Sequence, residues 1–274
     1  MRIARARPLL GTIVEIAIDA RSHAQAERAS TNAFDTIACI HATMSAHDPA
    51  NALAQLCENA HLRPIAVSPP LRQVLRAACR LHELSGGVFD VTVGAQLRRS
   101  GFLPRNGRKL HGGNGSDIRV LQDGRIRFAR PLDIDLGGIA KGYAVDRAVA
   151  VLKRSGIRQG LVNAGGDLRV FGPRAEPVHI RDAEDPTTLH LAGSLANGAI
   201  ATTAGYYFEP DDSRRSRRTP VFDPIARRHA ALRDSVTVAA PTCMMADALT
   251  KIVALRGDAA TPLLRRLRAR RILT

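Results

Sequence analysis

The chain contains no tryptophan, few other aromatic residues and very little lysine. Aromatic residues make up 4% of its 274 residues, which leaves little material for stacking on nucleic-acid bases. The formal net charge is +15, but lysine occurs at only four positions and arginine is spread along the whole length. Scattered arginine with scarce aromatics disfavours a nucleic-acid binder, for which salt-sensitive binding to any duplex would be expected.

Arginine is concentrated at two places, residues 214–218 and 265–271. Either cluster could attract anions. A solvated loop for the first cluster and a solvated C-terminal face for the second are the better interpretation, because runs of like charge usually face water.

Closely spaced cysteines and long apolar runs are also missing. The four cysteines show no close pair and no His/Cys cluster at zinc spacing, so we expect buried free thiols. No apolar run is long enough to span a bilayer, and the charged residues 1–8 are not followed by an apolar segment of signal-peptide length. These observations predict a soluble cytoplasmic protein without a membrane span.

The hydrophobic spacing predicts strands and helices that interleave without a strict β-α-β order. Strands are expected at residues 12–18, 118–121, 125–128, 161–170 (kinked at a glycine pair) and 235–239, with more between 179 and 201, and helices at 24–43, 71–84, 142–154 and 242–255. Residues 88–94 are expected to form a short strand or turn, and residues 105–116 and 210–219 loops. This order favours an α+β fold over a doubly wound sheet. No clean linker divides residues 1–274, so we predict a single domain.

The stretch from Asp133 to Asp146 is the most informative part of the chain. An apolar run with carboxylates at Asp133 and Asp135 leads into a glycine pair, then Lys141, and then a segment with helical spacing. A strand, a glycine turn, a lysine and a helix would place backbone N–H groups and one cation where a phosphate or pyrophosphate can bind. An ordinary turn between a strand and a helix is the more frequent explanation of such a pattern taken alone.

Other polar motifs accompany this stretch, although no nucleophile elbow, Walker loop or metalloprotease helix is present. They lie at residues 89–94, 163–167, 201–207 and 246–251.

In order and approximate spacing, these motifs resemble those of the ApbE-like flavin transferases (FAD:protein FMN transferases). Residues 135–146 resemble the family segment Asp-Leu-Ser-Ala-Ile-Ala-Lys-Gly-Tyr-Ala-Val-Asp almost letter for letter. Residues 10–12 resemble Met-Gly-Thr, 44–49 Met-Ser-Thr-Tyr-Asp-Pro, 89–94 Phe-Asp-Pro-Thr-Val-Gly, 203–207 Thr-Ser-Gly-Asp-Tyr, and 236–249 a segment that ends Ala-Asp-Ala-Leu. The resemblance covers nearly the whole chain.

The resemblance implies a T-fold-like mixed α/β architecture, with antiparallel-rich sheets and packed helices. It also implies an enzyme that binds FAD and, with Mg²⁺, transfers FMN onto a Thr or Ser of an acceptor protein and releases AMP. Splitting a pyrophosphate requires charge neutralisation on the leaving phosphate, which a divalent ion with oxygen ligands or a lysine can supply.

The resemblance also assigns site residues, by matching this sequence to the family's motifs position by position. The implied FAD contacts are His47, Thr92, Val93, Gly94, Asp135, Lys141 and Val221. The implied metal contacts are the Gly138 carbonyl, Asp247 and the hydroxyl of Thr250. No catalytic residue is assigned.

Three positions depart from the family pattern. Lys251 stands four residues after Asp247, where the family usually has threonine; Pro220 opens a segment that reads His-Ile-Ile-Asp-Pro in the family; and Ala204 replaces the serine of Thr-Ser-Gly. Thr250 could substitute for the threonine, but one helical step turns it by about 100°.

Lys251 has two interpretations. Because it is an i,i+4 neighbour of Asp247 on a helix, it can pair with this carboxylate and occupy or neutralise the metal site. Alternatively, it points to solvent beside an unchanged site. The alternative function is therefore an FAD-binding relative in which transfer activity is lost or altered.

Overall fold

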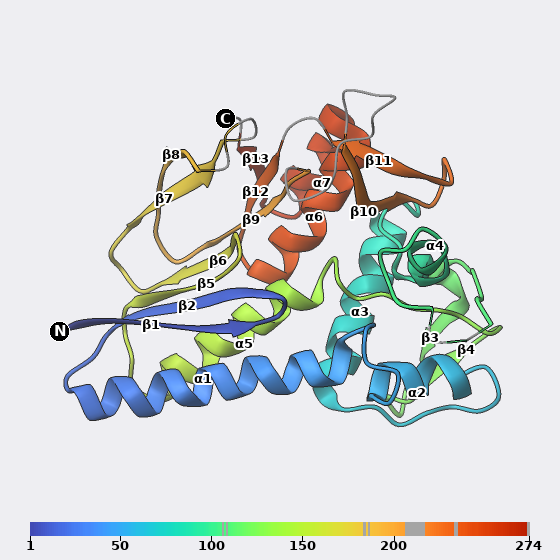
Figure 1. Cartoon of the computed structure of the whole chain (residues 1–274), viewed down its shortest axis with the longest axis horizontal. Coiled ribbons are helices and arrows are strands. Elements are labelled where there is room, and N and C mark those ends of the chain that lie inside the picture. The colour runs from blue at the N-terminus through green and yellow to red at the C-terminus, as the bar shows by residue number, and fades with distance from the viewer. Residues whose placement is uncertain are drawn as a thin grey trace. The chain divides into compact units, whose positions relative to one another are not determined.

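The computed structural model describes residues 1–105, 107, 109–182, 185, 187–205, 217–232 and 235–272. The chain folds into two compact units (Figure 1). Unit 1 comprises Met1–His41, Lys141–Arg218 and Ala231–Thr274, and unit 2 comprises Ala42–Ala140 and Thr219–Ala230. The single domain over residues 1–274 stays a prediction.

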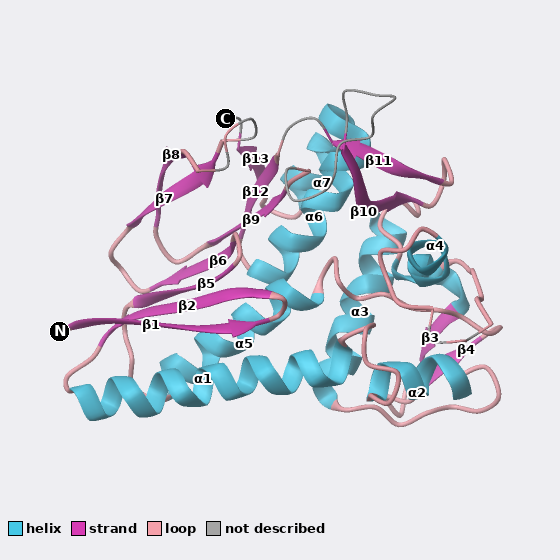
Figure 2. Ribbon diagram, in the orientation of Figure 1, coloured by secondary structure: helices cyan, strands magenta, loops and turns pink. Residues whose placement is uncertain are grey.

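Unit 1 contains a seven-stranded sheet in which every pair of neighbouring strands is antiparallel (Figure 2). Its strands, in spatial order, are β1 (Arg2–Leu9), β2 (Thr12–Asp19), β5 (Gly160–Ala164), β6 (Asp167–Phe171), β9 (Ala199–Thr203), β12 (Val236–Ala240) and β13 (Arg270–Ile272). Every residue of β12 is buried, whereas the edge strand β1 alternates between exposed and partly buried residues. A separate antiparallel hairpin joins β7 (Glu176–Arg181) to β8 (Leu189–Leu195).

Helices cover the sheet of unit 1. They are α1 (His23–Met44, which belongs to unit 1 up to His41), α5 (Ala140–Arg154), α6 (Cys243–Arg256) and α7 (Thr261–Arg266), with the 3₁₀ turn η3 (Gly257–Ala260) between the last two. Helix α6 packs on β9 and β12, and α5 buries Val145, Ala148 and Val149 as its spacing predicts. Helix α1 is held to β1 by the Arg7 guanidinium, which lies 4.8 Å from the Phe34 ring centroid.

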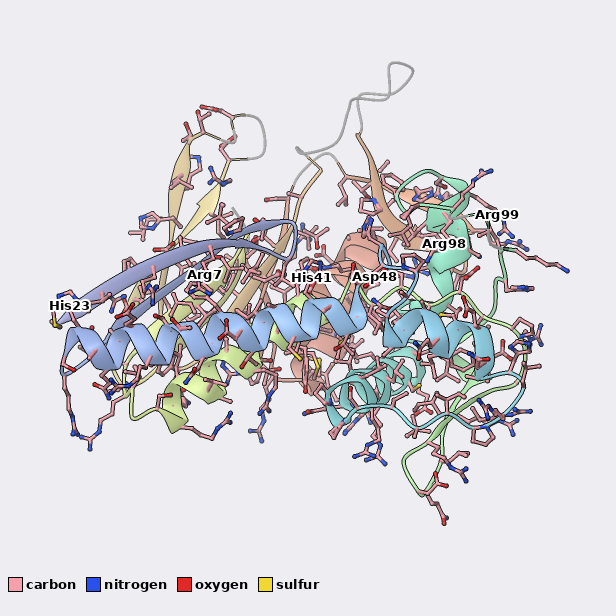
Figure 3. The ribbon with its side chains drawn as sticks, turned by 60° about the horizontal axis from the view of Figure 1, so that its bottom comes forward. Arg7, His23, His41, Asp48, Arg98 and Arg99 are labelled. Atoms are coloured by element: carbon pink, nitrogen blue, oxygen red, sulfur yellow. The ribbon has the colours of Figure 1, made fainter. Side chains whose placement is uncertain are left out.

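Unit 2 is built from short elements. These are α2 (Ala52–Asn59), α3 (Pro69–Leu84), η1 (Val91–Val93), α4 (Gly94–Arg99), η2 (Gly115–Asp117), the antiparallel pair β3 (Ile118–Val120) and β4 (Ile126–Phe128), and residues 219–230 of the pair β10 (Arg217–Asp223) and β11 (Arg228–Leu232). Helix α3 begins where Ser68 accepts a hydrogen bond from the Leu71 N–H at 3.5 Å and two prolines follow. Figure 3 shows Arg98 and Arg99 on α4.

The α+β class with antiparallel sheets is confirmed. Three local predictions were wrong. Residues 161–170 are not one kinked strand but a hairpin of β5 and β6, because Gly165 and Gly166 both have positive φ (63° and 100°) and reverse the chain. Residues 133–136 form no strand. Of the four free thiols that were expected to be buried, Cys39 is exposed and Cys79 is half-buried. Residues 88–94 form no strand but a turn that ends in η1, one of the two alternatives given for them.

Some expectations concern parts of the chain that the structure leaves out. The predicted loops at 105–116 and 210–219 and the first arginine cluster include residues outside the described ranges. The second arginine cluster falls in α7, β13 and the residues between them. Among the helices of the described residues, none is both long and apolar enough to cross a membrane.

Candidate functional site

Two carboxylates and two ammonium groups meet in unit 1. Lys141 Nζ contacts Asp167 Oδ2, and Lys251 Nζ contacts Asp247 Oδ1. Lys141 Nζ also lies 3.9 Å from Asp247 Oδ1, so one group of side chains is formed, which we call the ionic cluster. Asp167 and Asp247 are 1% and 0% exposed. Buried carboxylates require partners of opposite charge, and the two lysines supply them.

The ionic cluster draws on three elements that are distant in sequence. Lys141 lies in the first turn of α5, Asp167 opens β6, and Asp247 and Lys251 are one helical turn apart on α6. Asp167 reaches its place because the chain reverses at Gly165, where a Cβ would lie 2.4 Å from Thr12 Oγ1. Only glycine fits this turn, and the turn sets the start of β6.

Helices α5 and α6 approach each other closely at Gly142. A Cβ at this position would lie 2.3 Å from the carbonyl oxygen of Cys243. The Gly142 N–H donates a hydrogen bond to Asp247 Oδ2 at 3.1 Å. The Asp247 carboxylate thereby caps the first turn of α5, where unpaired N–H groups and the helix dipole favour a negative charge.

A second carboxylate, Asp146, caps α6 from the side of α5. Its Oδ1 accepts the Cys243 N–H at 2.9 Å, and its Oδ2 accepts the Met244 N–H at 3.0 Å. Oδ1 also pairs with Arg169 Nη1. Asp146 was recognised in the sequence only as the last letter of a motif, and its role as a capping residue was missed.

Charge and burial oppose each other in the ionic cluster. For Asp247, burial favours the neutral acid, but Lys141 and Lys251 outweigh it and hold the pKa below its usual value. Burial and the neighbouring Asp247 charge raise the pKa of Asp167. Burial disfavours the ammonium of Lys141, yet Asp167 and Asp247 together raise its pKa above the usual value. Asp247 is therefore the carboxylate held most firmly in its charged form.

The predicted metal residues have other partners. Mg²⁺ requires a nearly octahedral shell of oxygens. Asp247 Oδ1 contacts an ammonium group, and its Oδ2 accepts an N–H. The Thr250 hydroxyl donates to the Asp247 carbonyl oxygen at 2.7 Å and lies 2.6 Å from Thr203 Oγ1. Gly138 belongs to the turn before α5, in unit 2.

This donor set does not fit a divalent cation. Asp247 Oδ1 is already paired with the Lys251 ammonium, and the Thr250 hydroxyl is turned toward its own helix and β9. Over the described ranges, no group of three or more His, Cys, Asp or Glu side chains could hold a metal ion. Of the two interpretations of Lys251 that the sequence left open, the structure has the one in which it pairs with Asp247.

Most of the predicted FAD contacts lie together in unit 2. The Gly94 N–H donates to the Asp133 carbonyl oxygen at 3.1 Å, and the Asp135 N–H donates to the Val91 carbonyl oxygen at 2.8 Å. These bonds align residues 91–94 with residues 133–135, and a Cβ at Gly94 would lie 2.6 Å from the Asp133 oxygen. Two motifs about 40 residues apart in the sequence are thus joined side by side by backbone hydrogen bonds.

The side chains in this aligned pair of segments differ in their exposure. Thr92 is 1% exposed, and its Oγ1 donates to Asp90 Oδ1 at 2.8 Å. Asp135 is half-buried, and its Oδ1 accepts the Gly137 N–H at 3.2 Å. His47 is exposed in the turn after α1, and Val221 is buried on β10. The two bonds that align the segments involve neither His47 nor Val221.

One polar pair in unit 2 has no counterpart in the sequence-based predictions. Ser100 Oγ lies 2.6 Å from His229 Nε2, and His229 Nδ1 lies 2.9 Å from the Thr219 carbonyl oxygen. Because a carbonyl only accepts, Nδ1 carries a proton, and in the neutral ring Nε2 accepts from the serine hydroxyl. The pair joins the end of α4 to the β10–β11 segment, and no motif pointed to it.

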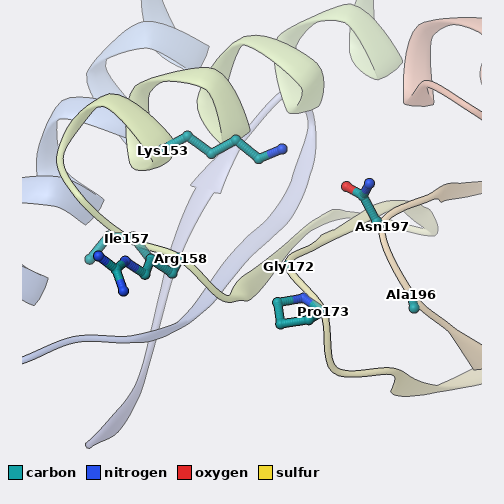
Figure 4. Close-up of a pocket in the computed structure, with 7 residues that line it drawn as sticks. All are labelled: Lys153, Ile157, Arg158, Gly172, Pro173, Ala196 and Asn197. Carbon is teal, nitrogen blue, oxygen red and sulfur yellow. The ribbon is translucent and has the colours of Figure 1, made fainter.

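A surface hollow of about 480 Å³ lies elsewhere in unit 1 (Figure 4). It is lined by Lys153, Ile157, Arg158, Gly172, Pro173, Ala196 and Asn197. None of these seven is a predicted site residue.

The protein thus combines a seven-stranded antiparallel sheet and packed helices with a lysine-carboxylate cluster where α5 meets α6. Comparison with known proteins identifies the family of proteins to which it belongs. A model of the ApbE family matches residues 10–272. The chain belongs to the ApbE family.

Curated relatives carry one name. The chain is 30% identical over 236 residues to the FAD:protein FMN transferase of Vibrio cholerae. This match covers 78% of this chain and 69% of the relative. It is 28% identical over 244 residues to the FAD:protein FMN transferase of Haemophilus influenzae. This match covers 80% of this chain and 70% of the relative.

Solved structures share the fold. The ApbE protein of Thermotoga maritima matches with a TM-score of 0.80 at 26% identity, over 97% of this chain and 90% of the other. The flavin transferase ApbE of Vibrio cholerae, in a mutant in which glycine replaces a histidine, matches with a TM-score of 0.83 at 24% identity, over 99% of this chain and 92% of the other. At this identity the second likeness shows the fold alone.

Proposed function

We propose that this protein is an FAD:protein FMN transferase. A Thr or Ser hydroxyl oxygen of an acceptor protein forms a bond to the FMN phosphorus of FAD, the anhydride bond to the AMP phosphate breaks, and the hydroxyl proton is released. The observation that carries the proposal is membership of a family whose curated relatives bear this name over most of the chain. The intact backbone pairing of residues 91–94 with 133–135 supports it.

The residues proposed to bind FAD are those implied by the family motifs. They are His47, Thr92, Val93, Gly94, Asp135, Lys141 and Val221. Of these, Lys141 is the one lysine; its ammonium is held beside Asp167, and its side chain is 36% exposed. A lysine acts on phosphate as a point charge and needs no fixed orientation.

The family also implies Mg²⁺, bound by the Gly138 carbonyl, Asp247 and Thr250. The donor set does not fit a divalent cation, because Asp247 Oδ1 is paired with the Lys251 ammonium. The contact of Lys251 with Asp247, together with Pro220 in place of the family's histidine, favours one alternative: a relative that binds FAD without transferring FMN.

The test uses the purified full-length chain, FAD and an acceptor protein with an exposed threonine, in Mg²⁺ and in EDTA. Mass spectrometry of the acceptor detects covalent FMN, and chromatography detects AMP. Lys141→Met is compared with Lys153→Met, which removes a lysine from the last turn of the same helix.

We expect transfer by the wild type and by Lys153→Met, and its loss in Lys141→Met. Retention of intact FAD without AMP or adduct, across several acceptors, would establish the alternative. Equal transfer by the two lysine variants would remove Lys141 from the site.

A further inference from the structure

We infer that the ammonium group of Lys251 takes the place of a divalent cation beside Asp247, so that this chain binds no Mg²⁺ there and cleaves FAD without it. The inference rests on the proposed function for the reaction, but its claim about metal binding is tested separately.

The first support is the position of the lysine. Lys251 Nζ contacts Asp247 Oδ1 along one turn of α6, and the Lys251 side chain is only 20% exposed. The neighbouring Ile252 and Val253 are buried, as is Thr250. Lys251 therefore directs its charge to a fully buried carboxylate and does not point to solvent, which removes the second of its two interpretations.

The second support is the set of partners around Asp247. Its Oδ1 has the Lys251 ammonium, its Oδ2 has the Gly142 N–H at 3.1 Å, and its carbonyl oxygen has the Thr250 hydroxyl at 2.7 Å. Each of its three side-chain and carbonyl oxygens is thus bound by a donor. A metal ion that binds Asp247 Oδ1 would have to displace the ammonium from it.

The third support is the balance of charge. Asp167 and Asp247 carry two negative charges, and Lys141 and Lys251 carry two positive charges. A divalent cation would leave the ionic cluster with an excess of two positive charges around carboxylates that are almost completely buried. Uncompensated charge in such surroundings is unfavourable, and like charges at this range repel.

The chemical consequence follows from the same balance. An ammonium supplies one positive charge and N–H donors, whereas a metal supplies two charges and direct coordination. Lys141 and Lys251 can offer N–H donors, held in place by the two carboxylates, to the oxygens of a pyrophosphate when its bond breaks. These donors are built into α5 and α6 and do not depend on an ion from solution.

The test measures metal binding by calorimetric titration with Mn²⁺ and by thermal unfolding in Mg²⁺ or EDTA. It compares the wild type with Lys251→Thr, which adds an oxygen and removes the charge, and with Lys251→Met, which only removes the charge. Lys153→Met is the matched control. Circular dichroism confirms that each variant is folded.

We expect a wild-type melting temperature that is the same in Mg²⁺ and EDTA, and Mn²⁺ binding at least tenfold tighter in Lys251→Thr than in the wild type. We also expect a melting temperature of Lys251→Thr that rises with Mg²⁺, because a ligand of the native state alone stabilises it. Lys251→Met should gain less than Lys251→Thr, because it offers no new oxygen.

Wild-type binding of Mn²⁺ as tight as that of Lys251→Thr would overturn the inference, and so would a folded Lys251→Thr that gains no affinity. If Lys251→Thr does not fold, the wild type decides: an Mg²⁺-dependent melting temperature that Asp247→Asn abolishes would overturn the inference. Cleavage of FAD by the wild type should continue in EDTA, and loss of cleavage there would also count against it. Absence of FAD cleavage under every condition would instead contradict the proposed function, while the metal titrations still stand.

Discussion

Replacing Asp146 with asparagine tests whether its carboxylate holds the start of α6. The carboxylate accepts the N–H groups of Cys243 and Met244 at 2.9 and 3.0 Å and pairs with Arg169. The Asp146 and Arg169 side chains are 14% and 18% exposed, so water compensates only part of what is lost. Asparagine keeps one acceptor oxygen but presents an amide donor to the second N–H group.

The expected cost can be built from its parts. Loss of one hydrogen bond to a charged acceptor is worth about 1.5–3 kcal/mol. Loss of a negative charge at a helix N-terminus adds about 0.3–1 kcal/mol. Arg169 Nε has no hydrogen-bond partner among the described residues, so the guanidinium depends on Asp146 more than a surface arginine would. We therefore expect Asp146→Asn to lower the free energy of unfolding by roughly 2–4 kcal/mol.

The measurement is urea unfolding followed by circular dichroism. Asp123→Asn is the control, since Asp123 pairs with Arg125 in an exposed turn and its loss should leave the free energy of unfolding almost unchanged. A double-mutant cycle with Arg169→Met isolates the ion pair. If Asp146→Asn is no less stable than Asp123→Asn, the carboxylate is not what holds α6 in place.

Three further predictions concern stability and reactivity. Gly142→Ala should lower the free energy of unfolding by about 1–3 kcal/mol in urea titrations, because its Cβ would meet the Cys243 backbone at 2.3 Å, and unchanged stability would contradict this packing. Asn51→Ala removes the cap of α2, an acceptor at 2.9 Å from a backbone N–H, and should cost about 1 kcal/mol by the same measurement. Burial raises the pKa of the Cys79 thiol to about 11. In a Cys39→Ser background, which removes the exposed thiol, the rate of alkylation of Cys79 should therefore rise about tenfold per pH unit between roughly pH 8 and pH 10, and a constant rate would refute this.

Local spacing predicted the four longest helices, α1, α3, α5 and α6, but not the short helices α2, α4 and α7. Helix α5 shows its apolar face at regular intervals, and α6 is capped by Thr242, whose hydroxyl accepts the Met245 N–H at 3.3 Å. The spacing of Asp247 and Lys251, one helical turn apart, made their pairing one of the two interpretations that the sequence offered. Features that depend on residues within about one helical turn of each other could therefore be predicted from the sequence.

Contacts between distant segments were not within reach. Asp167 joins the ionic cluster only because the register of β5 and β6 places it there, and the glycine pair was taken for a kink in one strand. The strand β1 was missed because its arginines look like a charged terminus, although Arg5 and Arg7 lie on the partly buried positions of an edge strand and contact α1. The Ser100–His229 pair joins residues 129 positions apart, and no local pattern encodes it.

The match of residues 135–146 to a family motif has a structural explanation as well as a functional one. Within this segment, Lys141 pairs with Asp167, Gly142 allows α6 to approach and donates to Asp247, and Asp146 caps α6. These three residues lie along less than two turns of α5 and all contact β6 or α6, which places Asp247 beside Lys141. The motif therefore builds the ionic cluster through contacts within the protein. Because Lys251 completes this cluster from α6, its charge acts on a carboxylate that α5 has already positioned, and this makes a single substitution on α6 sufficient to decide whether the site can accept a metal ion.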